Sequence, residues 1–284
     1  MSSANDRLAR SQNPPVAMTI AGSDSGGGAG IQADLKTFAA LGVFGTSAIT
    51  ALTAQNTVGV AGVHPVPPEF VVAQIEAVLA DLPVAATKTG MLATAPILRA
   101  VAQLAATGRL PQLVVDPVMV ASSGARLLDP DAERAYVELL LPHAAVATPN
   151  LREAEVLIGR PITTLAQQRE AAEQLAALGP GAVVVKGGHA VTDTPGEAVD
   201  VVAVGGTLTE LRAPRVPTRN NHGSGCSFGS AVTAGLAQGM STMDAIAAAK
   251  QFVHRAVTGG ATWTLGKGHG PLDHFGWSTA SRHG

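Results

Sequence analysis

Short runs rich in valine, isoleucine and threonine alternate with longer alanine- and leucine-rich segments along this 284-residue chain. The alternation is typical of βαβ units, in which helices cover both faces of a parallel sheet. The expected strands are Val16–Ala21, Thr46–Thr53, Ala85–Thr89, Leu113–Asp116, Ala145–Thr148 and Ala182–Lys186. The expected helices are Ala29–Leu41, Glu69–Leu82, Ala95–Ala106, Ser227–Gln238 and Met243–Val257.

Two further expected strands, Val199–Val204 and Thr207–Leu211, flank the pair Gly205-Gly206. Two glycines between strand-like segments favour a primed turn, so we expect a hairpin at the antiparallel edge of the sheet. One α/β domain over residues 16–284, preceded by a flexible polar segment over residues 1–15, accounts for the whole pattern.

Charge and composition exclude several classes of function. The formal net charge is −2 and no run of Lys or Arg occurs, so we expect no nucleic acid partner. The uncharged stretch Thr37–Pro68 is broken by glycines and prolines, which indicates a buried central strand and no membrane span. A single cysteine, and no apolar signal segment within Met1–Pro15, favour a cytoplasmic protein.

Polar residues fall where several expected strands end. Asp116, Asn150 and Lys186 occupy such positions, and Gln55 occupies a similar one after the expected strand Thr46–Thr53. Open α/β sheets bind ligands at the carboxyl ends of their strands. We therefore expect the binding site at this edge of the sheet.

The turn His222–Cys226 precedes an expected helix. Gly223, Ser224 and Gly225 would expose backbone N–H groups at the positive end of the helix dipole, which suits a phosphate. A tight turn that only allows close helix packing is the alternative. Cys226 would lie in the first helical turn, where the dipole lowers a thiol pKa, so it is a candidate base; an inert buried thiol is the alternative.

The first glycine-rich loop, Gly22–Gly30, lies between a strand and a helix. Gly28–Ala33 fits the dinucleotide pattern G-x-G-x-x-A, but no Asp or Glu occurs between Asp34 and Glu69 to bind a ribose. The chain also lacks the G-K-[S/T] triplet of a Walker A loop. The sequence therefore argues against NAD and against a P-loop.

Three residues are candidates for the nucleotide end of the site. Lys186, followed by Gly187-Gly188, could approach a phosphate, or it could be a solvated lysine at a strand end. Asn150 and Glu153 would share one face of a starting helix and could orient Mg²⁺ or its waters. Asn150 is equally well explained as a helix N-cap.

Taken together, these motifs resemble those of the hydroxymethylpyrimidine/phosphomethylpyrimidine kinases, a family of thiamine biosynthesis within the ribokinase-like superfamily. The resemblance covers about Val16 to Pro271. It rests on the segments Ala21–Asp34, Thr53–Thr57, Lys88–Leu92, Thr148–Ala154, Val185–His189 and His222–Cys226. It implies a three-layer α/β/α ribokinase-like fold, a homodimer, and phosphorylation of 4-amino-5-hydroxymethyl-2-methylpyrimidine by ATP and Mg²⁺, first to the monophosphate and then to the diphosphate.

The resemblance also implies roles for individual residues. Gln55 matches the glutamine that binds the pyrimidine, since an amide offers both a donor and an acceptor. Cys226 matches the position of the base. The remaining residues expected to line the substrate pocket are Gly22, Ala29, Asp34, Met91 and Val118, with Asp34 near the hydroxymethyl group and Met91 against the ring.

Two other functions remain open at this point. Pyridoxal kinase is one alternative, because pyridoxine-type alcohols have a similar ring and hydroxymethyl group. A non-catalytic pyrimidine-binding protein on the same scaffold is the other.

Overall fold

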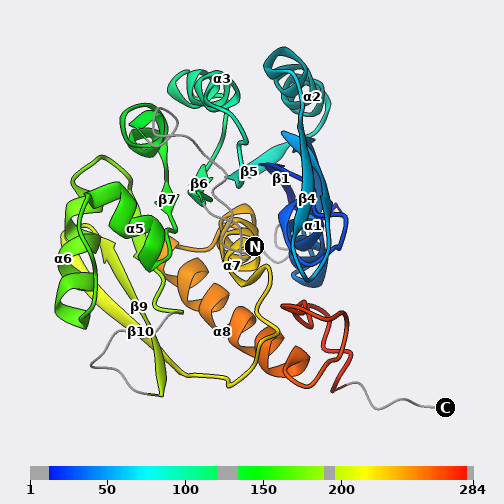
Figure 1. The fold of residues 1–284 in the computed structure, drawn as a ribbon. Coiled ribbons are helices and arrows are strands. Elements are labelled where there is room, and N and C mark those ends of the chain that lie inside the picture. The colour runs from blue at the N-terminus through cyan, green and yellow to red at the C-terminus, as the bar shows by residue number, and fades with distance from the viewer. Residues whose placement is uncertain (1–12, 120–133, 189–195, 280–284) are drawn as a thin grey trace, which may run out of the picture.

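The computed structural model describes residues 13–119, 134–188 and 196–279. Its centre is an eight-stranded sheet in the order β10-β9-β8-β7-β6-β5-β1-β2 (Figure 1). The strands are β1 (Val16–Ala21), β2 (Phe44–Ile49), β5 (Val84–Thr89), β6 (Val114–Val115), β7 (Val146–Ala147), β8 (Ala182–Val185), β9 (Glu197–Val204) and β10 (Thr207–Pro214).

The strands from β2 to β8 pair in parallel, whereas β9 pairs antiparallel with β8 and β10 antiparallel with β9. The prediction of a mostly parallel sheet with an antiparallel hairpin at its edge is therefore confirmed.

Helices cover both faces of this sheet, as expected for three layers. One face carries α1 (Gly30–Ala40), α7 (Ser224–Ala237) and α8 (Thr242–Gly260), and the other carries α2 (Pro68–Asp81), α3 (Ala95–Ala106), α5 (Leu151–Ile158) and α6 (Leu165–Ala176). A π-helical turn, η1 (Tyr136–Leu140), and a 3₁₀ turn, η2 (Leu141–His143), lie beside α3. In the part of the chain that the structure describes, no helix is long and apolar enough to cross a membrane.

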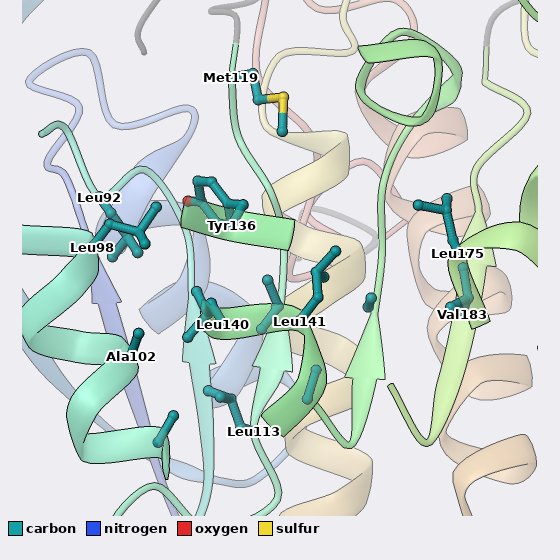
Figure 2. Packing of buried hydrophobic residues seen from close by; sticks show 14 of the residues in the cluster. Leu92, Leu98, Ala102, Leu113, Met119, Tyr136, Leu140, Leu141, Leu175 and Val183 are labelled. Atoms are coloured by element: carbon teal, nitrogen blue, oxygen red, sulfur yellow. The ribbon is translucent and has the colours of Figure 1, made fainter. Parts of the chain in front are cut away.

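The period-two alternation of the strands divides the core between these two layers. Val114, Val184 and Val202 point toward α7 and α8, whereas their neighbours Val115 and Val183 point toward the opposite helices. Figure 2 shows the second layer, with side chains of α3, η1 and η2 packed over the sheet. Each fully buried aliphatic side chain of this kind stabilises the fold by about 1.5–3 kcal/mol.

The expected strand Thr46–Thr53 is wrong, because the chain turns at Thr50. Before this residue it forms β2, and after it β3 (Ala51–Gln55), which pairs antiparallel with β4 (Val60–Pro65) in a separate two-stranded sheet. The buried central strand expected within Thr37–Pro68 is wrong as well: β2 lies at the edge of the main sheet, and β4 is largely exposed.

Side chains of β3 alternate between a face that is exposed to solvent and a face that is partly buried. Leu52 and Ala54 are exposed to solvent, while Thr53 and Gln55 on the opposite face are partly buried and line the cavity described below. The polar side chains of β3 thus face the cavity, while Leu52 and Ala54 face solvent. Of the flexible segment expected over residues 1–15, residues 1–12 lie outside the described part of the chain.

Candidate functional site

A cavity of about 700 Å³ lies where the parallel strands end. Its wall combines the loop after β1, the end of β3, the loops after β5, β6 and β8, the start of α5 and the start of α7. The structure brings together all but one of the predicted site residues in this cavity: Gly22, Ala29, Gln55, Met91, Val118, Asn150, Glu153, Lys186, Gly223, Ser224, Gly225 and Cys226.

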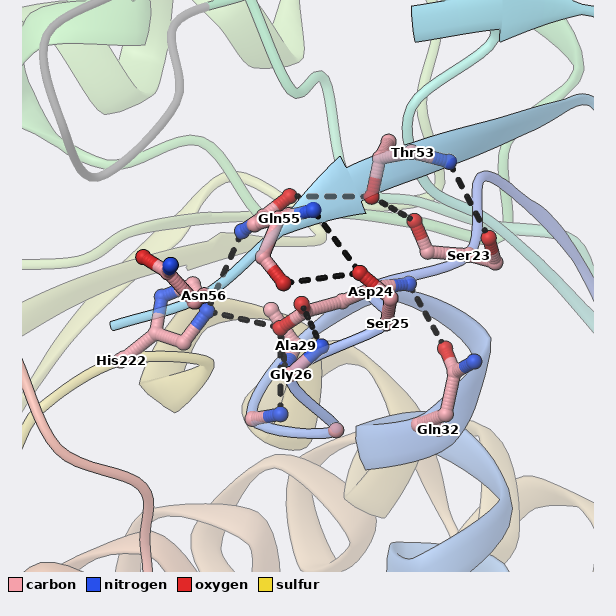
Figure 3. Close-up of polar contacts among 12 residues, drawn as sticks. Ser23, Asp24, Ser25, Gly26, Ala29, Gln32, Thr53, Gln55, Asn56 and His222 are labelled. Atoms are coloured by element: carbon pink, nitrogen blue, oxygen red, sulfur yellow. Dashed lines mark hydrogen bonds and ion pairs between the residues drawn. The ribbon is translucent and has the colours of Figure 1, made fainter. Parts of the chain in front are cut away.

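The loop between β1 and α1 folds around the carboxylate of Asp24, which is 2% exposed. Oδ1 accepts a hydrogen bond from the N–H of Gly26 (2.8 Å), and Oδ2 accepts from the N–H groups of Gly28 (3.1 Å) and Ala29 (2.9 Å) (Figure 3). His222 Nε2 lies 2.8 Å from the same Oδ2. Burial would raise the pKa of Asp24, but these hydrogen bonds outweigh it and hold the pKa below its ordinary value. Asp24 is therefore an ionised acceptor at neutral pH.

Gln55 ends β3 and lies between Thr53 and His222 (Figure 3). Its side-chain Oε1 lies 3.3 Å from Thr53 Oγ1 on one side, and its Nε2 lies 3.3 Å from His222 Nε2 on the other. Its main chain is fixed to the glycine-rich loop, because the hydroxyl of Ser25 donates to the Gln55 carbonyl (2.7 Å) and accepts from the Gln55 N–H (2.8 Å). The hydroxyl of Ser25 thus fixes both main-chain polar groups of Gln55, whose side-chain amide extends into the cavity.

Apolar contacts line the cavity beside this amide. Gly22 donates its N–H to the carbonyl of Met91 (3.1 Å), and a Cβ at residue 22 would overlap the Met91 methyl group. The absence of a side chain at Gly22 lets Met91 lie against the loop, where it faces the cavity together with Val118. This surface suits the flat face of an aromatic ring.

The anion turn, defined here as Gly223–Cys226, opens α7. Gly223 precedes the helix with φ +85°, and a Cβ there would overlap the carbonyl oxygen of Gly28, so only glycine fits. Ser224 N–H donates to the Asn221 carbonyl, and the later Ser227 N–H to the Gly223 carbonyl. Among the described residues, the N–H groups of Gly225 and Cys226 have no acceptor. These donors remain available for an anion at the helix N-terminus.

The lowered pKa expected for Cys226 is wrong. The pKa of this thiol is raised to about 12, chiefly by burial and also by the nearby charges of Asp34 and Asp116, and the charge of Lys88 offsets only part of the increase. The helix dipole is thus outweighed by the low polarity of the surroundings. Cys226 is a neutral thiol at physiological pH.

Asp34 does not line the cavity, contrary to the expectation. It is fully buried one layer beneath, where it accepts hydrogen bonds from Thr19 Oγ1 (2.6 Å), Ser230 Oγ (2.6 Å) and Lys88 Nζ (3.1 Å). These three buried donors hold its carboxylate away from the cavity. Lys88 extends from Asp34 to the cavity wall.

Lys88 therefore brings a buried positive charge to the cavity. Burial would lower the pKa of Lys88, but the charges of Asp34 and Asp116 outweigh it and hold the pKa above its ordinary value. The ammonium has three protons, and Asp34 takes one of them among the described residues. An electronegative ligand atom beside Cys226 would meet this cation.

A second lysine carries the charge of the nucleotide end. Lys186 Nζ lies 2.9 Å from Asp116 Oδ1, and both side chains are almost fully buried. Burial would lower the pKa of Lys186, but Asp116 and Glu153 hold it above its ordinary value. Lys186 is therefore a charged group in the cavity wall, and the alternative of a solvated lysine is wrong.

Asn150 is the N-cap of α5, which confirms one of the two roles predicted for it. Its side chain accepts from the Glu153 N–H (3.0 Å), while Glu153 Oε2 accepts from the Asn150 N–H (2.7 Å). Burial raises the pKa of Glu153 to about 8, although Lys186 lowers it in part. Both residues still line the cavity, so the cap does not exclude contact with a ligand.

The carboxylates of Asp116 and Glu153 suit a metal ion whose remaining ligands are waters and substrate phosphates. No group of three or more His, Cys, Asp or Glu in the described ranges could hold a metal ion alone. Mg²⁺ commonly keeps waters and substrate phosphates and takes one or two protein carboxylates. Asp116 and Glu153 could supply these oxygens.

Comparisons with known proteins agree with this geometry. The sequence profile of the phosphomethylpyrimidine kinase family matches residues 24–273. The chain belongs to this family. A hydroxymethylpyrimidine/phosphomethylpyrimidine kinase of Rhizobium meliloti is 50% identical over 262 residues, which are 92% of this chain and 97% of that protein. The family that the motifs resemble is thus confirmed, and this family member is a phosphotransferase.

Solved structures extend the comparison to the fold of this phosphomethylpyrimidine kinase family member. An ADP complex of pyridoxal kinase from Bacillus subtilis has a TM-score of 0.84 at 38% identity and covers 92% of this chain and 98% of that one. Pyridoxal kinase from Staphylococcus aureus in complex with AMP-PCP and pyridoxal has a TM-score of 0.84 at 35% identity, covering 94% and 96%. The ribokinase-like fold is confirmed, and these nucleotide complexes support the use of ATP.

Sequence reasoning on this kinase missed two residues of its site. Asp24 and Lys88 line the cavity, yet no role was predicted for them. Asp24 occupies a glycine-rich loop that follows a strand, and Lys88 occurs inside an otherwise apolar strand. An isolated charge in either context indicates a buried, partnered group and could have revealed both residues.

Proposed function

We propose that this chain transfers the γ-phosphoryl group of ATP to the hydroxymethyl oxygen of 4-amino-5-hydroxymethyl-2-methylpyrimidine, and then phosphorylates the monophosphate, in thiamine biosynthesis. One observation carries the proposal: a single cavity contains an amide beside an apolar surface, and also two cations with a helix N-terminus. The first part suits an aminopyrimidine ring, and the second suits phosphates.

The proposed roles of the nucleotide end follow from the charge of phosphoryl transfer. A loose transition state spreads negative charge over the phosphoryl oxygens, so catalysis consists mainly of positioning and charge stabilisation. The N–H groups of Gly225 and Cys226 would donate to these oxygens, and Lys186 would bind the phosphates. Mg²⁺, when bound, would neutralise phosphate charge. Glu153 and Asp116 would hold it, with Asn150 fixing the orientation of Glu153.

The proposed roles of the substrate end use the other part of the wall. Gln55 would bind the ring edge, and Gly22, Ala29, Met91 and Val118 would contact the ring. The neutral thiol of Cys226 would orient the attacking hydroxyl as a weak acceptor. The hydroxyl proton leaves late in a loose transition state, so it would pass to an oxygen of the transferred phosphoryl group, and Cys226 would need only to orient the hydroxyl. Lys88 would stabilise negative charge that develops on this oxygen.

The decisive test is a comparison of kcat/KM for the pyrimidine alcohol and for pyridoxal, followed by ADP release with ATP and Mg²⁺. We expect the pyrimidine to have the larger value. A larger value for pyridoxal would make the chain a pyridoxal kinase, the second candidate, which the two structural relatives with TM-scores of 0.84 favour. Binding without turnover of either alcohol would instead indicate a non-catalytic protein.

The homodimer implied by the family and the cytoplasmic location favoured by the single cysteine remain predictions. Sedimentation equilibrium of the purified chain would test the first, because a dimer has twice the chain mass of 28.6 kDa. Fractionation of cells would test the second.

A further inference from the structure

We infer that His222 and Thr53 hold the side-chain amide of Gln55 in one orientation, with its carbonyl oxygen toward His222 and its NH2 group toward Thr53. His222 and Thr53 are then positioning residues that determine which ring edge the site accepts. The inference rests on the proposed role of Gln55 as a ligand of the substrate ring. As drawn in Figure 3, the amide has the opposite orientation, with Gln55 Nε2 3.3 Å from His222 Nε2 and Oε1 3.3 Å from Thr53 Oγ1. Nitrogen and oxygen of a carboxamide have nearly the same shape, so a rotation of the amide exchanges them, and the protons of the neighbours decide the orientation.

His222 must carry a proton on Nε2. Asp24 Oδ2 lies 2.8 Å from this nitrogen and is ionised at neutral pH, so it only accepts hydrogen bonds. Nε2 therefore donates to Asp24, whichever charge the imidazole has. A ring nitrogen that bears a proton has no lone pair left to accept a hydrogen bond from Gln55.

The amide atom 3.3 Å from His222 Nε2 must consequently be an acceptor. An NH2 group at this position would direct a donor at another donor. The Gln55 carbonyl oxygen instead shares the Nε2 proton with Asp24 as a three-centre hydrogen bond. This contact favours one orientation of the amide.

Thr53 independently requires the same orientation. Its hydroxyl has one proton, which it donates to the Ser23 carbonyl oxygen at 2.8 Å. Thr53 Oγ1 can therefore only accept at its 3.3 Å contact with Gln55. The NH2 group of Gln55 is the donor for this contact, so the two neighbours agree.

The substrate would meet the rest of the amide. One N–H and one lone pair of Gln55 remain for the cavity, with the acceptor on the His222 side and the donor on the Thr53 side. A ring must then place a donor beside His222 and an acceptor beside Thr53. A 4-aminopyrimidine does so with its amino group and N3. The 4-oxo analogue, with a carbonyl at position 4 and a proton on N3, presents the reverse order.

The test is calorimetric binding of the 4-amino alcohol and its 4-oxo analogue to the full chain. Two mismatched hydrogen bonds correspond to about 100-fold weaker binding of the 4-oxo compound by the wild type. Thr53→Val and His222→Leu each remove one constraint on the amide, so we expect the ratio of the two dissociation constants to fall about fivefold in each. Thr53→Ser keeps the hydroxyl and His222→Gln keeps an N–H donor, so both should keep the ratio.

The ratio separates positioning from a merely structural role. Equal binding of the two compounds by the wild type would overturn the inference. An unchanged ratio in both Thr53→Val and His222→Leu, with thermal unfolding confirming that they fold, would overturn it too, even if both compounds bound more weakly. A wild type that discriminates in binding but transfers no phosphate would support the inference and refute the proposed kinase reaction.

Discussion

Alkylation of Cys226 by iodoacetamide should be slow at neutral pH and should accelerate tenfold per pH unit well above pH 9. Cys226 is the only cysteine of the sequence and lines the cavity, so the reagent reports on one accessible thiol. Its pKa is raised to about 12 from an ordinary 9.0 by burial and by Asp34 and Asp116. Thiolate, and not thiol, is the species that reacts.

The expected size of the effect combines two opposing contributions. At pH 8 the thiolate fraction is about 1 in 10⁴ for a pKa of 12 and about 1 in 10 for an ordinary thiol, a difference of about 1,000-fold. A more basic thiolate is intrinsically more nucleophilic, which returns about 20-fold over three pKa units. The lower thiolate fraction is the larger effect, so the alkylation rate at pH 8 should be about 50-fold below that of an ordinary thiol.

The assay is mass spectrometry of the alkylated chain between pH 7 and 10.5, with urea-unfolded protein as the reference for an ordinary thiol. Lys88→Met should slow the reaction further, because it removes the positive charge that partly lowers the Cys226 pKa. A rate that reaches a plateau below pH 9 in the folded protein would mean a stabilised thiolate. That result would refute the burial argument and restore the helix dipole as the larger effect.

Three stability predictions use urea unfolding. Lys88→Met should lower the free energy of unfolding by about 3–5 kcal/mol, because it leaves the carboxylate of Asp34 buried without its cation. Adding Asp34→Asn should recover part of this loss. Purely additive effects of the two substitutions would contradict the argument. Gly223→Ala should lower the free energy of unfolding by at least about 2 kcal/mol. Gly239→Ala should cost less, because Gly239 has a similar φ of +81° but open space around it. Equal costs would exclude the overlap with the Gly28 carbonyl as the cause. The pKa of Glu153 is raised in the folded protein to about 8 from an ordinary 4.5, so its contribution to the free energy of unfolding is complete below pH 4.5 and is lost as pH rises toward 8. The stability of Glu153→Gln relative to the wild type should therefore increase between pH 5 and 8. A stability difference that does not change with pH would refute the raised pKa.

Periodicity and turn chemistry were sufficient for most of the fold. The Ala/Leu pattern located α3 at its correct ends, and Gly205-Gly206 located the β9–β10 hairpin. The division between β2 and β3 was not predictable in this way, because Thr50 interrupts no pattern of propensity. The chain turns there because its neighbours change: Thr50 N–H bonds the Ala21 carbonyl, and Thr50 Oγ1 bonds the Met91 carbonyl. Long-range partners decide such a boundary.

The site shows the same limit in its electrostatics. Strand ends and glycine turns located Gln55, Lys186 and the anion turn, because these positions follow from topology. The pKa of Cys226 and the position of Asp34 depend on how deeply each side chain is buried and on which charges lie around it. These quantities require the packed structure.

The hydrogen bond between Asp24 and His222 joins residues 198 positions apart, and that between Asp34 and Ser230 joins residues 196 apart. Contacts of such separation form slowly, because most of the chain must be ordered before the two partners meet. During synthesis, the glycine-rich loop emerges from the ribosome long before the helix that completes it. The reacting centre is therefore among the last regions to assemble, and a partly made chain would hold its substrate loop without an anion site.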